Sequence, residues 1–175
     1  SSSKLLSKEI ATQLRGRTLS YFLLPFSFRE FLRARGLSVN RYMSKDEAAK
    51  IKHYLLEYVE FGGFPDVVLS EAKTKILKEY ADLILFRDFV ERHQIKNIEV
   101  ARFLHSFTIQ NFSKEISVNA LFNRIKSMGV KVSKNTVYDY LSKLEDTAFF
   151  FFLRRYSERP HMRESYPKKT YLCDT

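Results

Sequence analysis

The sequence predicts a mainly helical protein with a small β component, and three observations carry that prediction. Apolar residues recur at helical spacing through most of the 175 residues. Only 5 glycines are present, too few for a turn-rich β barrel, while the 45% of hydrophobic and 29% of charged residues are typical of globular proteins. The last part of the chain reads as three helices followed by a β-hairpin, which is the order of a winged helix-turn-helix.

The chain is expected to open with a helix and a strand. Apolar side chains recur at helical spacing over residues 4–14. The short corner Arg15–Arg17 follows, with a glycine in its middle that is typical of a helix end. Thr18–Leu24 is rich in β-forming residues. One strand forms no sheet alone, so we expect its partners to lie in an N-terminal part of a longer protein, of which this chain is a fragment.

The next segment, residues 27–93, is predicted to be a small all-helical unit. Capping boxes begin helices at Ser27 and at Ser44, each with a glutamate three residues later. The corner Gly62–Pro65 predicts a firm helix stop. A third helical stretch is expected over Ser70–Arg92, where apolar residues form one stripe.

The C-terminal segment changes character near Asn97. Helices are predicted over Glu99–Phe112, Ser117–Met128 and Asn135–Thr147. The aromatic run that follows, together with Lys169–Cys173, predicts a β-hairpin. Its four consecutive phenylalanines, residues 149–152, are expected to serve as core and interface rather than as a base-stacking platform.

The basic character of the chain suggests a nucleic-acid contact. The formal net charge is +10 and the pI is about 9.7. At the start of the third helix of the winged helix, side chains that suit phosphates or base edges are Lys131, Lys134, Asn135, Thr136 and Tyr138. The cations of the hairpin are Arg154, Arg155, Arg159, Arg163, Lys168 and Lys169. The alternative is that these cations are solvated surface and the winged helix docks against protein.

Several classes of function are disfavoured. The single cysteine, Cys173, rules out an internal disulfide, and no two histidines stand at metal-ligand spacing, so no metal site is expected. The chain has no Gly-x-x-x-x-Gly-Lys-Ser/Thr phosphate-binding loop and no recognisable Ser/His/Asp set. Apolar runs are too short to span a bilayer and no leader is seen, so we expect a cytoplasmic protein without membrane contact. The carboxylates of Asp82, Asp88, Glu145 and Asp146 are expected on helix surfaces.

The arginines of the corner, Arg15 and Arg17, have two interpretations. A helix C-terminus favours cations through its dipole, and on spacing alone this interpretation is preferred. The other is a guanidinium presented to a phosphoryl group at a subunit boundary, where it would stabilise developing charge.

Seven stretches occur in an order that resembles one family. They are Ser1–Leu6, Leu14–Arg17, Leu24–Leu32, Gly62–Pro65, Arg87–Arg92, Val132–Leu141 and Lys169–Thr175. The sequence resembles the AAA+ ATPases of archaea and bacteria in which a P-loop ATPase domain is followed by a winged helix and then a restriction-endonuclease-like domain. Both Walker motifs and the nuclease-like domain are missing from this sequence.

The resemblance implies the end of an AAA+ core in 1–26, a helical lid in 27–93 and a winged helix in 94–175. It implies that Arg15 or Arg17 is an arginine finger that reaches a neighbouring subunit, and that Arg87 or Arg92 serves as sensor 2. ATP and Mg²⁺ are implied for the parent protein and no cofactor for this fragment, which is expected to be inactive alone.

Three functions follow as expectations. The first is a fragment of an ATP-hydrolysing protein whose winged helix contacts DNA, with the missing ATPase core and a homo-oligomer as partners. The second is a stand-alone winged-helix regulator that binds DNA without nucleotide. The third is a protein-interaction module that uses the aromatic hairpin.

Overall fold

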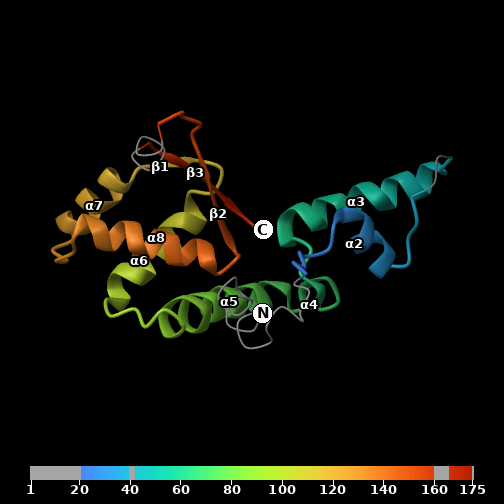
Figure 1. Ribbon diagram of the computed structural model, residues 1–175. Coiled ribbons are helices and arrows are strands. Elements are labelled where there is room, and N and C mark those ends of the chain that lie inside the picture. Colours follow the sequence, from blue (N-terminus) through green and yellow to red (C-terminus); the bar gives the residue numbers. More distant parts are fainter. Residues whose placement is uncertain (1–20, 40–41, 160–165, 175) are drawn as a thin grey trace, which may run out of the picture. The chain divides into compact units, whose positions relative to one another are not determined.

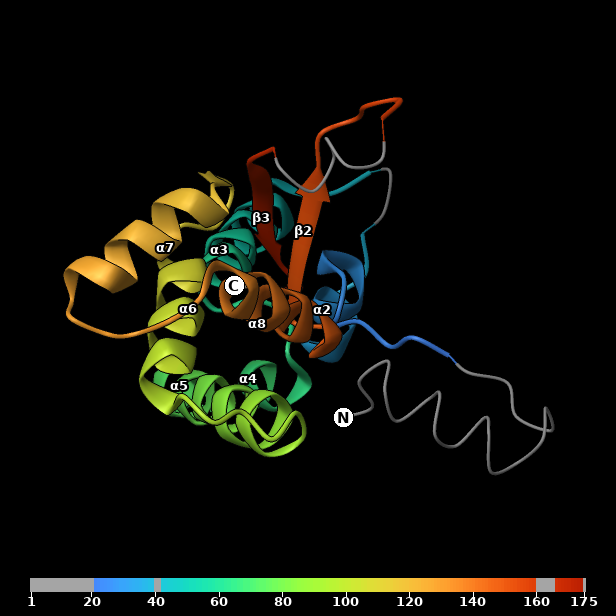
Figure 2. The same cartoon turned by 60° about the vertical axis from the view of Figure 1, so that its left-hand side comes forward.

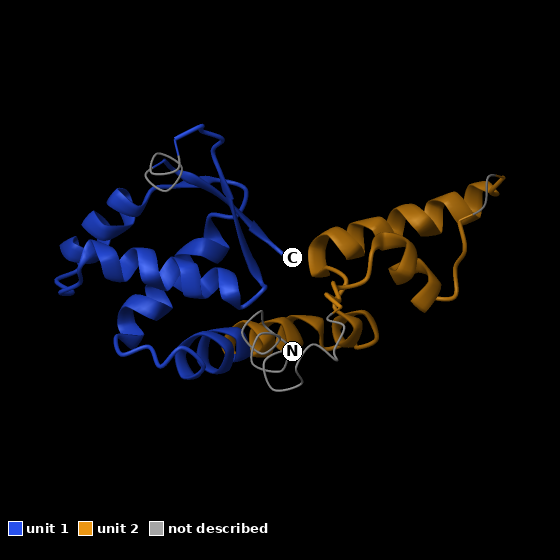
Figure 3. Ribbon diagram, viewed as in Figure 1, with its two compact units in different colours: residues 1–20, 83–173 blue, residues 21–82, 174–175 orange. Residues whose placement is uncertain are grey.

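The computed structural model describes residues 21–39, 42–159 and 166–174, which form two compact units (Figure 3). One comprises residues 83–173 and the other residues 21–82 with Asp174. The chain passes from one unit to the other at 82/83, earlier than the domain boundary at 93/94 that the sequence suggests. The reason is that Leu85 and Phe89 are buried in the core of the 83–173 unit.

Four helices form the 21–82 unit: α2 (Phe28–Ala34), α3 (Lys45–Phe61), α4 (Pro65–Val68) and α5 (Lys73–Leu83). Both predicted capping boxes are confirmed. The Glu47 carboxylate accepts the backbone N–H of Ser44 at 2.8 Å, and the Ser44 hydroxyl accepts that of Glu47 at 3.2 Å. These bonds satisfy amide groups that a helix start leaves without partners, and they fix where α3 begins.

A small aromatic core holds the 21–82 unit together. Phe31, Leu32 and Val68 are buried, and the ring of Tyr58 meets that of Phe31 edge-on with 5.4 Å between the ring centres. The Tyr58 hydroxyl also donates to the carbonyl oxygen of Phe26 at 2.8 Å. The chain before α2 is thereby fastened to the side of α3.

The Gly-Gly-Phe-Pro corner ends α3 as predicted, but a short helix, α4, follows that the sequence did not suggest. Gly62 has a φ of 75° and a ψ of −164°, and the N–H of Gly63 donates to the Asp174 carboxylate at 2.6 Å. A side chain at Gly63 would collide with the carbonyl oxygen of Phe26. Pro65 takes the first position of α4, where its missing N–H costs nothing.

The strand predicted over Thr18–Leu24 is not formed in its described part. Residues 21–24 have no regular secondary structure and are exposed, Leu23 by 91%. Residues 18–20 lie outside the described residues. The described part of the chain supplies no strand that pairs with this segment, and a lone strand has no ladder to stabilise it.

The 83–173 unit contains a π-helix, three α-helices and a three-stranded sheet (Figures 1 and 2). In chain order the elements are η1 (Ile84–Glu91), α6 (Ile98–Gln110), β1 (Glu115–Ile116), α7 (Val118–Ser127), α8 (Lys134–Asp146), β2 (Phe150–Arg154) and β3 (Lys168–Leu172). The sheet is antiparallel, with the strand order β1-β3-β2. The helices and the hairpin agree with the sequence prediction to within a few residues, whereas β1 was not predicted.

The core of this unit lies between the three α-helices and one face of the sheet. Phe89, Leu104, Leu144 and Phe150 are fully buried there. Phe152 is buried as well, so the expectation that the phenylalanine run contributes core is confirmed for two of its four rings. Among the described residues, every helix falls short of the length and hydropathy that crossing a bilayer requires.

Candidate nucleic-acid interface

The N-terminal turn of α8 has a fixed geometry. The Ser133 hydroxyl accepts the N–H of Thr136 at 3.0 Å and lies 2.8 Å from the Thr136 hydroxyl. Val137 and Tyr140 are buried on the inner side of the helix. Because α8 presents this inner side to the core, its first residues are held with their other side to solvent.

Of the five residues predicted here, three are exposed and two are partly covered. Lys131, Lys134 and Asn135 are exposed. Thr136 is half-buried in the cap, and Tyr138 is half-buried against the core. The exposed set combines two ammonium groups with one amide, a set that suits phosphate oxygens and base edges.

The hairpin cations divide into two groups. By strand alternation, Arg154 and Lys168 lie on the inner side of the sheet. Lys168 is only 6% exposed, whereas Arg154 stays exposed and donates to the Glu145 carboxylate at 3.1 Å. Arg155, Arg159 and Lys169 are exposed. Arg163 lies outside the described residues.

A hollow of about 400 Å³ opens beside the start of α8. The loop 94–97 forms its other wall and is held by Tyr140, whose hydroxyl accepts the N–H of Asn97 at 3.2 Å. Three ammonium groups line it, from Lys96, Lys131 and Lys143. Lys143 pairs with Asp139 at 2.7 Å, which leaves the other two lysines as the cations that suit an anionic group here.

His93 lies close to this region and carries a perturbed imidazole. It is half-buried, and its Nε2 makes no hydrogen bond to any described residue. Burial lowers the pKa of His93, and the nearby carboxylate of Asp146 opposes that shift. The ring is therefore held in its neutral form more firmly than an exposed histidine.

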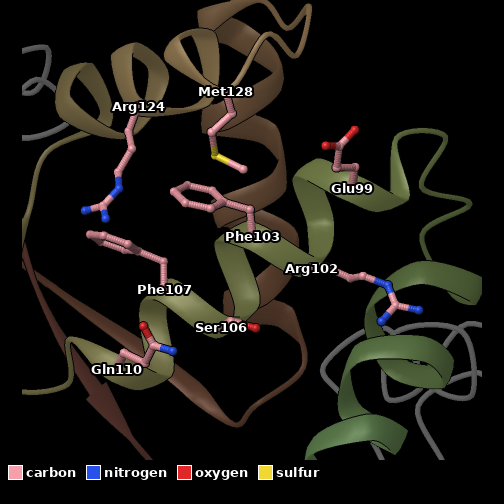
Figure 4. A pocket seen from close by; sticks show the side chains of 8 residues that line it. All are labelled: Glu99, Arg102, Phe103, Ser106, Phe107, Gln110, Arg124 and Met128. Carbon is pink, nitrogen blue, oxygen red and sulfur yellow. The ribbon is translucent and has the colours of Figure 1, made fainter.

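A second hollow, of about 410 Å³, lies between α6 and α7 (Figure 4). Phe103, Phe107 and Met128 supply its apolar wall. The guanidinium of Arg124 lies 5.4 Å from the centre of the Phe107 ring, and Figure 4 shows the two side chains facing one another. Arg102 reaches away to the ring of Phe86 at 4.8 Å. Both guanidinium groups therefore already lie over aromatic rings of the unit.

The arginines considered for sensor 2 share one carboxylate. Arg87 approaches Asp88 at 3.2 Å and Arg92 approaches it at 3.8 Å. The hydrogen bond to Asp88 raises the pKa of Arg87. Asp88 is only 7% exposed, so its expected place on a helix surface was wrong, whereas Asp82 is exposed. The spacing of four residues between Asp88 and Arg92 was the sequence signal for this pair.

The finger candidates Arg15 and Arg17 lie outside the described residues. In the described ranges, His, Cys, Asp and Glu side chains form no group of three that could hold a metal ion.

Comparison with known proteins adds two family matches. A family model described as a domain of unknown function, DUF8612, matches residues 52–175, and one described as an AAA domain matches residues 1–32. An uncharacterized protein of Methanocaldococcus jannaschii is 44% identical over 160 residues, which cover 90% of this chain and 36% of that protein. An uncharacterized protein of Haemophilus influenzae is 29% identical over 161 residues, 91% of this chain and 38% of that protein. The chain thus spans little more than a third of these relatives, and no solved structure matches it.

Proposed function

The chain belongs to the DUF8612 family, and from that premise we propose that its 83–173 unit is a winged helix-turn-helix that binds duplex DNA. The order α6, β1, α7, α8, β2, β3 supports this assignment, since α7 and α8 follow one another as a helix pair and a hairpin completes the unit. In such modules the second helix of the pair enters the major groove.

The observation that carries the proposal is the N-terminal turn of α8. Lys134 and Asn135 are exposed there, Lys131 precedes them, and the opposite side of the helix is buried. The exposed cations of the hairpin, Arg155 and Lys169, provide further phosphate contacts. A basic chain with a net charge of +10 gains affinity for DNA through counterion release.

We further propose that the parent protein is an AAA-type ATPase. The match of residues 1–32 to an AAA domain supports this. The relative from Methanocaldococcus jannaschii is longer than this chain, which covers 36% of it, so a parent protein of that length has room for a further domain. In that protein residues 1–26 would end the ATPase core and residues 27–93 would form its lid. ATP and Mg²⁺ would bind to the core outside this chain, with Arg15 or Arg17 reaching a neighbouring subunit of a homo-oligomer.

The DNA proposal is tested by fluorescence anisotropy with a labelled random duplex over a series of salt concentrations. We expect binding that weakens steeply with salt. Lys134→Ala should lower the affinity and reduce the slope of log K against log salt by about 1. Lys78→Ala is the matched control, because it removes one exposed lysine from α5 and changes the net charge equally.

The outcomes separate the three functions. Equal effects of Lys134→Ala and Lys78→Ala would remove α8 from the interface. Tight duplex binding with no dependence on ATP in the full-length relative would favour the stand-alone regulator. No duplex binding at low salt would contradict the proposal and leave the protein-interaction module.

A further inference from the structure

The second face of the β2–β3 sheet has an unusual composition. Phe150, Phe152 and Thr170 face the core and are buried. Since side chains alternate along a strand, the residues between them face the other way. Cross-strand pairing places Phe151 opposite Tyr171 and Leu153 opposite Lys169. We call Phe151, Leu153, Lys169 and Tyr171 the outer face.

Three of the four outer-face side chains are apolar or aromatic, and the face is partly open to solvent. Leu153 is 62% exposed, Tyr171 is 37% exposed, and Phe151 is half-buried. In an antiparallel sheet with one packed side, the other side is usually polar. Two aromatic rings and one leucine on this side therefore indicate a binding surface for a partner molecule.

Cations are interleaved with the aromatic rings of this hairpin. The ammonium of Lys169 lies 5.6 Å from the centre of the Tyr171 ring, and the guanidinium of Arg155 lies 5.2 Å from the centre of the Tyr166 ring. Tyr156, directly after Arg155, is 81% exposed. Protein interfaces have few lysines in their apolar centre, so Lys169 beside Tyr171 does not suit a buried protein contact.

The net charge of the hairpin also favours an anionic partner over a protein surface. Its described residues, 149–159 and 166–172, contain five cations and a single acidic residue, Glu158. Surfaces that hold single-stranded nucleic acid combine positive charge along the backbone path with aromatic rings on which successive bases stack. Of these cations, Lys169 lies on the outer face, where Glu115 of β1 is also its cross-strand neighbour, and Arg155 and Arg159 follow the end of β2. The outer face and the residues just after β2 together supply the rings and the positive charge.

We propose that the outer face stacks unpaired bases, so that the protein engages single-stranded nucleic acid or the single-stranded arm of a junction. This inference rests on the proposed function, since it assumes a DNA-binding unit, and it names the form of nucleic acid that the unit prefers. Tyr171 provides the stacking ring, and Lys169 and Arg155 contact the phosphates.

The test measures anisotropy with three labelled probes: oligothymidine, a blunt duplex, and a duplex with a single-stranded arm. Oligouridine, in a further arm, distinguishes RNA from DNA as the source of the bases. Tyr171→Ala should weaken oligothymidine binding about five- to hundredfold, as expected for one lost stacking contact. Tyr171→Phe keeps the ring and should bind like the unaltered chain.

Two further variants keep the result interpretable. Leu56→Ala removes exposed apolar surface from α3, outside the outer face, and it should change binding less than twofold. Tyr156 lies outside β2, so Tyr156→Ala should leave the sheet intact even if Tyr171→Ala unfolds the sheet. Tyr156→Ala should also weaken oligothymidine binding. Circular dichroism establishes that each variant is folded.

The possible failures are distinguishable. If the chain binds duplex but not oligothymidine, the outer face does not stack unpaired bases, and the proposed function stands. If Tyr171→Ala weakens duplex and oligothymidine equally, the ring is not a base-stacking group. If the chain binds none of the probes, both the proposed function and the stacking role of the outer face are refuted.

Discussion

Gly62 is a position in the 21–82 unit where one added methyl group should be costly for two separate reasons. Its backbone, with φ 75° and ψ −164°, lies in a region that glycine adopts almost alone. A Cβ there would overlap the carboxylate of Asp174. That carboxylate accepts the Gly63 N–H at 2.6 Å, so Gly62→Ala combines backbone strain with the loss of a charge-assisted hydrogen bond.

The two contributions set the magnitude. Backbone strain costs about 1–3 kcal/mol. A hydrogen bond to a charged group contributes about 1.5–3 kcal/mol. Gly62→Ala should therefore lower the free energy of unfolding by about 2.5–6 kcal/mol, a large part of the roughly 5–15 kcal/mol of stability that a domain has. Asp174→Ala should cost only the hydrogen-bond part, and in that background Gly62→Ala should cost only the strain.

Urea unfolding of the four proteins of this double-mutant cycle, followed by far-ultraviolet circular dichroism, measures the coupling. Hydrogen exchange of peptides around residues 58–69 assigns the loss to this unit. Gly36→Ala is the control, because Gly36 also has a φ of 75° but a Cβ there would have no heavy atom within 4 Å. Costs of Gly62→Ala and Asp174→Ala that add to within about 0.5 kcal/mol would refute the reasoning.

Three more outcomes are expected. Phe150→Ala, at a fully buried ring, should lower the free energy of unfolding by about 3–5 kcal/mol in a denaturant melt, whereas Leu153→Ala should change it by about 0.5 kcal/mol or less. The hydrogen bond from Tyr80 to Asp66 raises the pKa of Tyr80 to about 12. Its stabilising effect should be full below pH 10 and lost as the pH rises through about 12, and an ultraviolet titration should lose that late tyrosinate signal in Tyr80→Phe. In a full-length relative, replacing the arginine that corresponds to Arg17 with alanine should slow ATP hydrolysis and leave ATP binding intact; unchanged turnover would reject the finger.

Local signals predicted most of the fold. The capping boxes at Ser27 and Ser44 and the glycine corner after Phe61 act within a few residues of the chain, so the sequence alone specifies them. The hairpin was predicted because the phenylalanine run and the later β-forming segment are both strong strand signals.

Long-range contacts account for what the sequence missed. β1 is only Glu115 and Ile116, and these residues are a strand only because they pair with Lys169 and Lys168. The burial of Asp88 depends on packing in the 83–173 unit, which its helical spacing does not reveal. At the candidate interface, Lys131, Lys134 and Asn135 are exposed as expected, but the covered state of Lys168 follows from the face of β3 on which it lies.

The strand order β1-β3-β2 has a consequence for synthesis on the ribosome. The central strand is the last of the three to be translated, because β3 pairs with both neighbours and lies at Lys168–Leu172. Until it emerges, β1 and β2 lack their pairing partner, and Phe150 and Phe152 belong to an open hydrophobic surface. The nascent chain is prone to aggregation at this stage. The sheet is completed in a single late step, when the five residues of β3 leave the ribosome.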